Sequence, residues 1–215
     1  MDQQNHRPSA KFRRFLWIGL ALLLLAGVAG VFGFLYFEKR PLPPSGGLYF
    51  PWRVEMPVPH FRQSDAEWHN KQLGWSDDTI GGAGCALCSA AMVMKFYGID
   101  TDPARLNEYL SATGGYTPEG WIYWEAAANL APGHLRKAYE DAPSYFLIDR
   151  NLLRGNPVIV RLRLSNGVTH FVVISGKKGF DYLIQDPMAG EGSPAYPLRK
   201  LGSPIEALRF YEKLK

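Results

Sequence analysis

Hydrophobic residues follow three different patterns along the chain. From Phe15 to Phe37, 23 consecutive residues carry no charge. From Cys85 to Tyr97 most positions are apolar on nearly every side of a helix, and the run ends at Gly98. After about residue 156, β-branched and aromatic residues come in short runs separated by glycine-containing turns. The patterns predict a long apolar helix, then a helical region around a buried helix, and finally an antiparallel sheet.

The first of these segments is long enough to cross a bilayer, because 23 helical residues span roughly 35 Å. Four basic residues precede it, which favours a cytoplasmic N-terminus and an exported C-terminal part. The small residues Gly27, Ala29 and Gly30 leave a cleaved signal peptide as the alternative. The apolar run continues past them to Phe37, so we expect one uncleaved transmembrane helix in a bacterial-type cytoplasmic membrane.

The transmembrane helix divides the chain into four expected parts. Residues 1–14 form a cytoplasmic tail, residues 15–37 the anchor, and residues 38–49 a tether containing proline and glycine. Residues 50–215 form one exported domain. Four basic residues and one acidic residue give the tail a net charge of +3, out of +4 for the whole chain. The exported domain is therefore nearly neutral, and we expect no nucleic-acid partner.

Cap and turn residues indicate the elements of the exported domain. Three glycines, at positions 81, 82 and 84, predict a turn before the helix of residues 85–97. Asp102 and Pro103 predict the N-cap and first turn of a second helix that runs to Leu110. Further helices are expected over residues 121–130 and 145–153, followed by strands over residues 156–164, 169–175 and 180–186. A helical lobe followed by an antiparallel meander is an α+β fold.

The two cysteines, Cys85 and Cys88, have different expected surroundings. Cys85 opens the central helix, where free backbone N–H groups and the helix dipole stabilise a thiolate. Cys88 lies one turn further on, among apolar residues that keep a thiol protonated and inert. A lone cysteine in such a helix is more often a packing residue than a nucleophile. Cys85 is therefore a candidate nucleophile only if suitable partners accompany it.

Such partners are present in a usable order. A nucleophilic thiol needs a base, and His170 is the one histidine of five that lies in a predicted strand. Asp186 ends the next predicted strand, so a hairpin places it beside His170, where it can orient the imidazole. An oxyanion hole needs the Cys85 N–H and a side-chain amide, for which Gln63 is the best-placed upstream glutamine.

Two other chemistries use cysteines at this spacing. Cys-Ala-Leu-Cys fits a thioredoxin-like redox motif, but that motif follows a strand in a βαβ unit. Cys85, Cys88, His170 and Asp186 are metal-ligand types, but only the two cysteines are close in sequence, whereas structural zinc sites use two close pairs. We therefore expect no metal and no cofactor, and hydrolysis through an acyl-enzyme.

Five segments resemble the cysteine peptidase family 39-like domains, relatives of the double-glycine leader peptidases in the papain-like clan. They are VPHFRQSDAEWHNKQLG, GGAGCALCSAAMVMKFYG, GNPVIVRLR, THFVVISG and YLIQDP. The resemblance implies a papain-like fold in which a central helix packs on an antiparallel sheet. It also implies that Cys85 is the nucleophile, His170 the base, Asp186 the orienting residue and Gln63 part of the oxyanion hole.

This family resemblance implies a cysteine peptidase acting on peptide or protein substrates outside the cytoplasm. The leader peptidases are fused to a transporter and cut on the cytoplasmic side, whereas this sequence carries no transporter and is expected to face outward. At Cys88 the family usually has a small hydroxyl residue, so we interpret that cysteine as a packing substitution. The alternatives are a catalytically inactive binding or tethering module and a transpeptidase or amide-forming acyltransferase.

Overall fold

The computed structural model describes residues 10–38 and 40–214, and within residues 10–38 it describes the side chains of residues 15–31 and 33. The chain divides into two units, residues 1–40 and 41–215. In the first unit, α1 (Ala10–Glu38) is a helix of 29 residues. Within the described part, no helix combines the length and the hydropathy needed to cross a membrane. Several side chains of the expected anchor, and residues 1–9 of the expected tail, lie outside the described residues, so both remain predictions.

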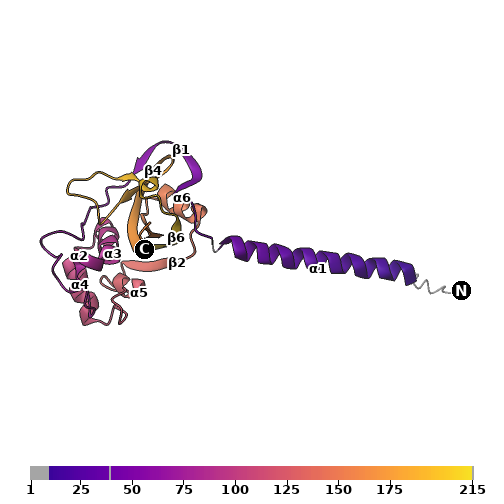
Figure 1. Cartoon of the computed structure of the whole chain (residues 1–215), viewed down its shortest axis with the longest axis horizontal. Coiled ribbons are helices and arrows are strands. Elements are labelled where there is room, and N and C mark those ends of the chain that lie inside the picture. Colours follow the sequence, from indigo (N-terminus) through magenta and orange to yellow (C-terminus); the bar gives the residue numbers. More distant parts are fainter. Residues whose placement is uncertain (1–9, 39, 215) are drawn as a thin grey trace. The chain divides into compact units, whose positions relative to one another are not determined.

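The second unit is built on an antiparallel sheet (Figure 1). Its strands lie in the order β1-β4-β3-β6-β2, and β5 pairs with β4 outside this path. The strands are β1 (Ser45–Glu55), β2 (Leu135–Asp141), β3 (Val158–Arg163), β4 (Thr169–Gln185), β5 (Tyr196–Pro197) and β6 (Ile205–Lys213). The α+β layout expected from the sequence is confirmed.

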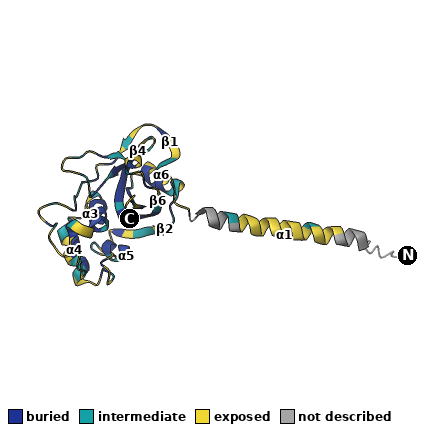
Figure 2. Ribbon diagram, in the orientation of Figure 1, coloured by how far each residue is buried: buried dark blue, intermediate teal, exposed yellow. Residues whose placement is uncertain are grey.

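The helices of this unit are short, and one of them is deeply buried. They are α2 (Ile80–Ala83), α3 (Cys85–Phe96), α4 (Pro103–Ala112), α5 (Trp124–Ala128), α6 (Tyr145–Leu153) and the 3-10 turn η1 (Leu198–Leu201). Every residue of α3 from Leu87 to Met94 is buried (Figure 2). The helix contacts β4, and the Ser89 hydroxyl donates a hydrogen bond of 3.2 Å to the backbone oxygen of Phe171. The expected central helix packed on a sheet is therefore present.

Local capping explains which helix boundaries could be predicted. Asp102 accepts a hydrogen bond from the Arg105 N–H at 2.9 Å and caps α4, as the sequence suggested, and Ser144 caps α6, whose expected range of 145–153 matches the structure. The expected glycine turn before α3 is instead mostly the short helix α2, because Thr79 caps it by accepting from the Gly82 N–H. The helix expected over residues 121–130 is shorter, since Ile122 forms a bridge with Tyr116 and the Tyr123 N–H donates to the Gly115 oxygen, so residues 121–123 are held outside the helix.

Two strands, β1 and β2, lie in the region that was expected to be mainly helical. β1 begins at Ser45, inside the expected tether, and the compact unit begins at Pro41. β1 contains a proline, and it pairs only with β4 along its length. Proline is tolerated in such an edge strand because no ladder hydrogen bond is needed from its nitrogen. Composition therefore suggested a tether where the structure has a sheet edge.

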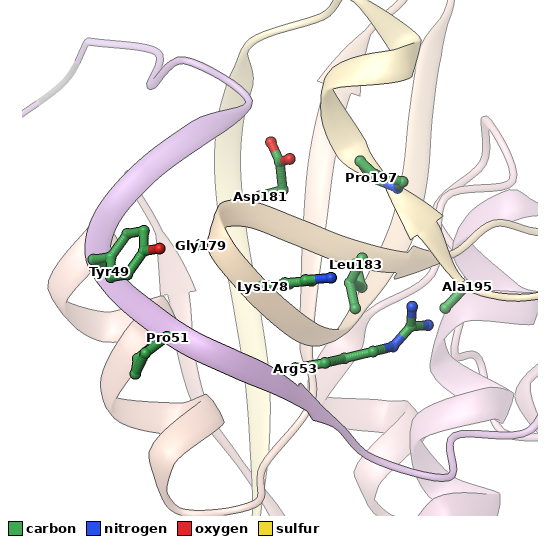
Figure 3. A pocket seen from close by; sticks show the side chains of 9 residues that line it. All are labelled: Tyr49, Pro51, Arg53, Lys178, Gly179, Asp181, Leu183, Ala195 and Pro197. Carbon is green, nitrogen blue, oxygen red and sulfur yellow. The ribbon is translucent and has the colours of Figure 1, made fainter.

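The largest difference from expectation concerns the strand that carries His170 and leads to Asp186. Two strands with a turn between them were expected, but β4 is a single strand of 17 residues. A straight strand of this length spans roughly 50 Å, whereas these two side chains hydrogen-bond, so β4 must curve back on itself. The curve passes through Gly179, which has φ +61° (Figure 3). At Gly176 a Cβ would overlap the backbone of β1, so only glycine fits there.

Candidate active site

His170 and Asp186 form a buried hydrogen-bonded pair. Nε2 of His170 lies 2.8 Å from Oδ1 of Asp186. The two side chains are only 2% and 4% exposed. The structure therefore brings together the two residues that the sequence placed on neighbouring segments of the sheet. Because Nε2 is engaged by the carboxylate, Nδ1 is the ring nitrogen left for another partner.

The Cys85 side chain is a further group that acts on this imidazole. Cys85 is the first residue of α3, and 9% of its surface is exposed. Burial lowers the pKa of His170, but hydrogen bonds to Asp186 and Cys85, together with the charges of both, raise it to about 9. The imidazole is thus held between a carboxylate and a thiol, and its protonated form is favoured at neutral pH.

The start of α3 also offers a free hydrogen-bond donor. The carbonyl four residues before Cys85 belongs to Gly81, and it accepts from Nε2 of Gln63 at 2.9 Å. No backbone acceptor takes the Cys85 N–H anywhere in the described part of the chain. An N–H beside a nucleophilic sulfur is correctly placed to bind an oxyanion that forms on the attacked carbonyl.

Gln63 lies beside this helix start and is 9% exposed. Its backbone N–H donates to the Pro187 oxygen at 3.0 Å, which ties the Gln63 segment to the residue after Asp186. A primary amide has two hydrogens, so the bond to Gly81 leaves one for a second acceptor. The Gln63 side chain can therefore contribute a second donor to an oxyanion at Cys85.

Sequence reasoning missed three groups that hold Asp186. The Tyr196 hydroxyl donates to Oδ2 at 2.5 Å, and the Met188 N–H donates to Oδ1 at 2.8 Å. Nε2 of His60 lies 2.7 Å from the backbone oxygen of Asp186. Burial raises the pKa of the Asp186 carboxyl, but hydrogen bonds from His170, Tyr196 and the Met188 N–H lower it below its ordinary value. The Met188 contact is a local Asx turn that an Asp-Pro pair could have signalled, whereas no local spacing signals the contacts of Tyr196 and His60.

Cys88 is in a different environment from Cys85. Its side chain is fully buried. Burial and, to a smaller extent, the charge of Cys85 raise the pKa of the Cys88 thiol well above its ordinary value. Both cysteines are free thiols. Within the described residues, no cluster of three or more histidine, cysteine, aspartate or glutamate side chains has an arrangement that could hold a metal.

Comparison with known families identifies the family of this domain. A profile of the Peptidase_C39 like family matches residues 55–210. The chain belongs to that family. The resemblance seen in the sequence is therefore confirmed, and all four candidate residues of this C39-like domain lie inside the matched range.

The C39-like domain was also compared with curated proteins and with solved structures. A search of curated proteins finds no match. Among solved structures, a crystal structure described as a C39-like peptidase from Bacillus anthracis is 16% identical in sequence. That alignment covers 76% of this chain and 100% of the other, with a TM-score of 0.47.

Proposed function

We propose that this chain is a cysteine peptidase with a Cys85, His170 and Asp186 triad, anchored in the membrane by α1 and acting outside the cytoplasm. The observation that carries the proposal is the buried imidazole of His170. Its Nε2 lies 2.8 Å from Asp186, and its other side meets the Cys85 thiol at the start of α3. Family membership supports a peptidase-type domain.

The reaction follows from these positions. Nδ1 of His170 takes the proton of the Cys85 thiol, and the resulting thiolate attacks the carbonyl carbon of a peptide bond. The Cys85 N–H and the free hydrogen of the Gln63 amide bind the oxyanion that forms. The imidazolium then protonates the leaving amine, which yields an acyl-enzyme. A water molecule, deprotonated by His170, hydrolyses the thioester and restores the thiol.

Asp186 has a supporting role in this mechanism. It accepts the Nε2 proton of His170, which fixes the ring and leaves Nδ1 as the nitrogen that exchanges a proton with the sulfur. Its negative charge also stabilises the imidazolium formed when Cys85 loses its proton. The pKa of His170, raised to about 9 by the balance of these contacts, keeps the imidazole protonated over most of the neutral pH range.

The membrane anchor is supported by the character of α1. Its described side chains are apolar and largely exposed, for example Phe15 at 75%, Trp17 at 67% and Leu23 at 73%. Such a helix is stable in lipid, which covers apolar side chains on all sides. Digestion of spheroplasts with an added protease tests the orientation. Loss of the exported domain in intact spheroplasts is expected, whereas full protection until lysis would contradict it.

Peptide cleavage tests the peptidase proposal. The full chain in detergent is incubated with a diverse peptide library, and products are identified by mass spectrometry. We expect cleavage by the wild type and by Cys88→Ser, and a loss of at least about 10³-fold for Cys85→Ala. Cleavage that survives Cys85→Ala would disprove the assignment. An added amine distinguishes a transpeptidase, because aminolysis products would then replace the hydrolysed ends.

A further inference from the structure

The Asp186 carboxylate has an uneven set of hydrogen-bond donors. Oδ1 accepts from Nε2 of His170 and from the Met188 N–H, both at 2.8 Å. Oδ2 accepts from the Tyr196 hydroxyl, and no other donor to this oxygen is found in the described part of the chain. Asp186 is 3% exposed, so water does not readily replace a lost donor. The state of Oδ2 therefore depends on one side chain.

The fold directs Tyr196 at this oxygen. Tyr196 belongs to the two-residue strand β5, where it pairs with Ile184 of β4, two residues before Asp186. Its neighbours Ala195 and Pro197 line a surface hollow of about 420 Å³ (Figure 3). Because successive side chains of a strand point to opposite faces, Tyr196 points away from this hollow and toward the interior. The pairing of β5 with β4 thus sets the hydrogen bond.

We propose that Tyr196 is a positioning residue of the catalytic site, whose hydroxyl keeps Asp186 ionised and turned so that Oδ1 faces His170. This inference rests on the proposed function, because the group that Tyr196 acts on is the orienting carboxylate of the triad. In the described part of the chain the Tyr196 hydroxyl bonds Asp186 and not the Cys85 thiol, so its effect reaches Cys85 through Asp186 and His170.

Two features make this hydroxyl more than a packing contact. Oδ1 already accepts two donors, so a proton added to Asp186 has to bind at Oδ2. Tyr196 directs its own hydrogen at that atom and therefore opposes protonation. If Asp186 became neutral, the imidazolium would lose its charge partner, and the proton would return from the imidazole to the Cys85 sulfur.

The backbone at Asp186 is held independently of Tyr196. Its carbonyl oxygen lies 2.7 Å from Nε2 of His60 and accepts from the Ala189 N–H at 3.0 Å. Among the described residues, the titratable groups in contact with Asp186 are His170 from β4, Tyr196 from β5 and His60 from the segment before α2. Replacement of Tyr196 by phenylalanine removes one oxygen and leaves the ring and these backbone bonds.

The test compares Tyr196→Phe with the wild-type full chain in detergent. The carboxyl carbon of Asp186 is titrated by NMR in protein labelled with ¹³C-aspartate, and its signal is assigned with Asp186→Asn. A hydrogen bond to a charged group corresponds to about one pH unit or more. We therefore expect the Asp186 midpoint to rise by about one unit. We also expect iodoacetamide to alkylate Cys85 more slowly at low pH, by less than about twofold near pH 5, with the difference vanishing toward pH 8.

The matched control is Tyr109→Phe, which removes the same atom from an exposed hydroxyl that donates to the Asn129 oxygen at 2.9 Å. It is expected to leave both measurements at wild-type values. An unchanged Asp186 midpoint in Tyr196→Phe would overturn the inference, as would an equal slowing of alkylation at every pH. If the wild type cleaves no peptide but the midpoint still rises, the peptidase proposal fails while the action of Tyr196 on the triad carboxylate stands.

Discussion

Two buried aspartates of this protein, Asp186 and Asp149, have closely similar surroundings and different roles. Each is bound by a basic side chain, a tyrosine hydroxyl and a backbone N–H. For Asp149 these are Lys177 at 2.6 Å, Tyr182 at 3.1 Å and the Leu48 N–H at 2.7 Å. Asp149 is 1% exposed and Asp186 3%. Burial of an ion pair is therefore not by itself a sign of catalysis.

The two aspartates differ in what else their basic partners, Lys177 and His170, contact. The Lys177 ammonium also donates to the Gly46 oxygen at 2.7 Å and lies 4.2 Å and 5.1 Å from the ring centres of Tyr182 and Phe50. Carbonyl, carboxylate and aromatic faces thus surround it, and none of these groups is a nucleophile. His170 instead keeps a second nitrogen for the Cys85 thiol. An ion pair becomes a candidate for chemistry when its titratable member can pass a proton to a third group.

The Asp149 cluster has a structural role. Gly46 and Leu48 belong to β1, Asp149 to α6, and Lys177 to β4, so the cluster fastens the first strand of the domain to a helix and to the longest strand. Similar polar chemistry therefore stabilises one edge of the sheet at the middle of β4 and forms the candidate active site where the two ends of β4 come together, at His170 and Asp186.

The largest expected effect is on peptidase activity, and it separates the two matched variants Asp186→Asn and Asp149→Asn. Loss of the orienting carboxylate is expected to lower kcat/KM for peptide cleavage by about 10³-fold. Asp149→Asn, assayed at a temperature where it is folded, should keep activity within a few-fold of the wild type. The measurement is kcat/KM on a peptide found in the library screen. Equal losses in the two variants would show that activity reports only fold integrity.

For stability we expect the opposite order: removing the basic partner of Asp149 should destabilise the fold more than removing the basic partner of Asp186. Lys177→Ala leaves Asp149 as an unpaired buried charge, so the free energy of unfolding is expected to fall by about 3–5 kcal/mol. His170→Ala should cost less, because it removes a partner from Asp186 alone, whereas Lys177→Ala also removes the donor of the Gly46 oxygen. Urea denaturation of both variants measures this. A loss below about 1 kcal/mol for Lys177→Ala would contradict the structural role of its cluster.

A smaller effect is expected in the pH dependence of stability. Folding raises the pKa of His170 from an ordinary 6.5 to about 9. The folded protein therefore binds the proton more tightly than the unfolded chain, and this stabilisation is complete below about pH 6.5. It is lost as the pH rises through about 9. Urea denaturation should show wild-type stability falling across this interval relative to His170→Gln. Parallel curves for the two proteins would contradict the shift.

Local signals explain what the sequence could predict. The caps Asp102 and Ser144 lie next to the helices they begin, so α4 and α6 could be placed from adjacent residues. His170 lies in a strand-like run only 16 residues from Asp186, and their pairing could be anticipated. Residue types and order were sufficient for the nucleophile, base and orienting carboxylate proposed here, since each stands in a recognisable local pattern.

Contacts between distant segments explain what the sequence could not predict. Residues 176–179, with the sequence GKKG, are typical of an exposed turn, yet Lys177 is fully buried. It is buried because β1 pairs with this part of β4 and Asp149 of α6 binds the Lys177 ammonium. Tyr196 reaches Asp186 only through the two-residue strand β5, which is too short to leave a pattern. His60 could not be linked to Asp186, which is 126 residues away in sequence.

The central claim is that Cys85 and His170 share a proton that Asp186 keeps on the imidazole. The most direct measurement is the rate of Cys85 alkylation by iodoacetamide from pH 5 to pH 9, followed by mass spectrometry in a Cys88→Ser background. With His170 present, the account predicts alkylation at pH 6–7 that is at least about tenfold faster than in His170→Ala. In His170→Ala the rate should be low there and should rise only above about pH 8, as for an ordinary thiol. Superimposable profiles with and without His170 would contradict the account.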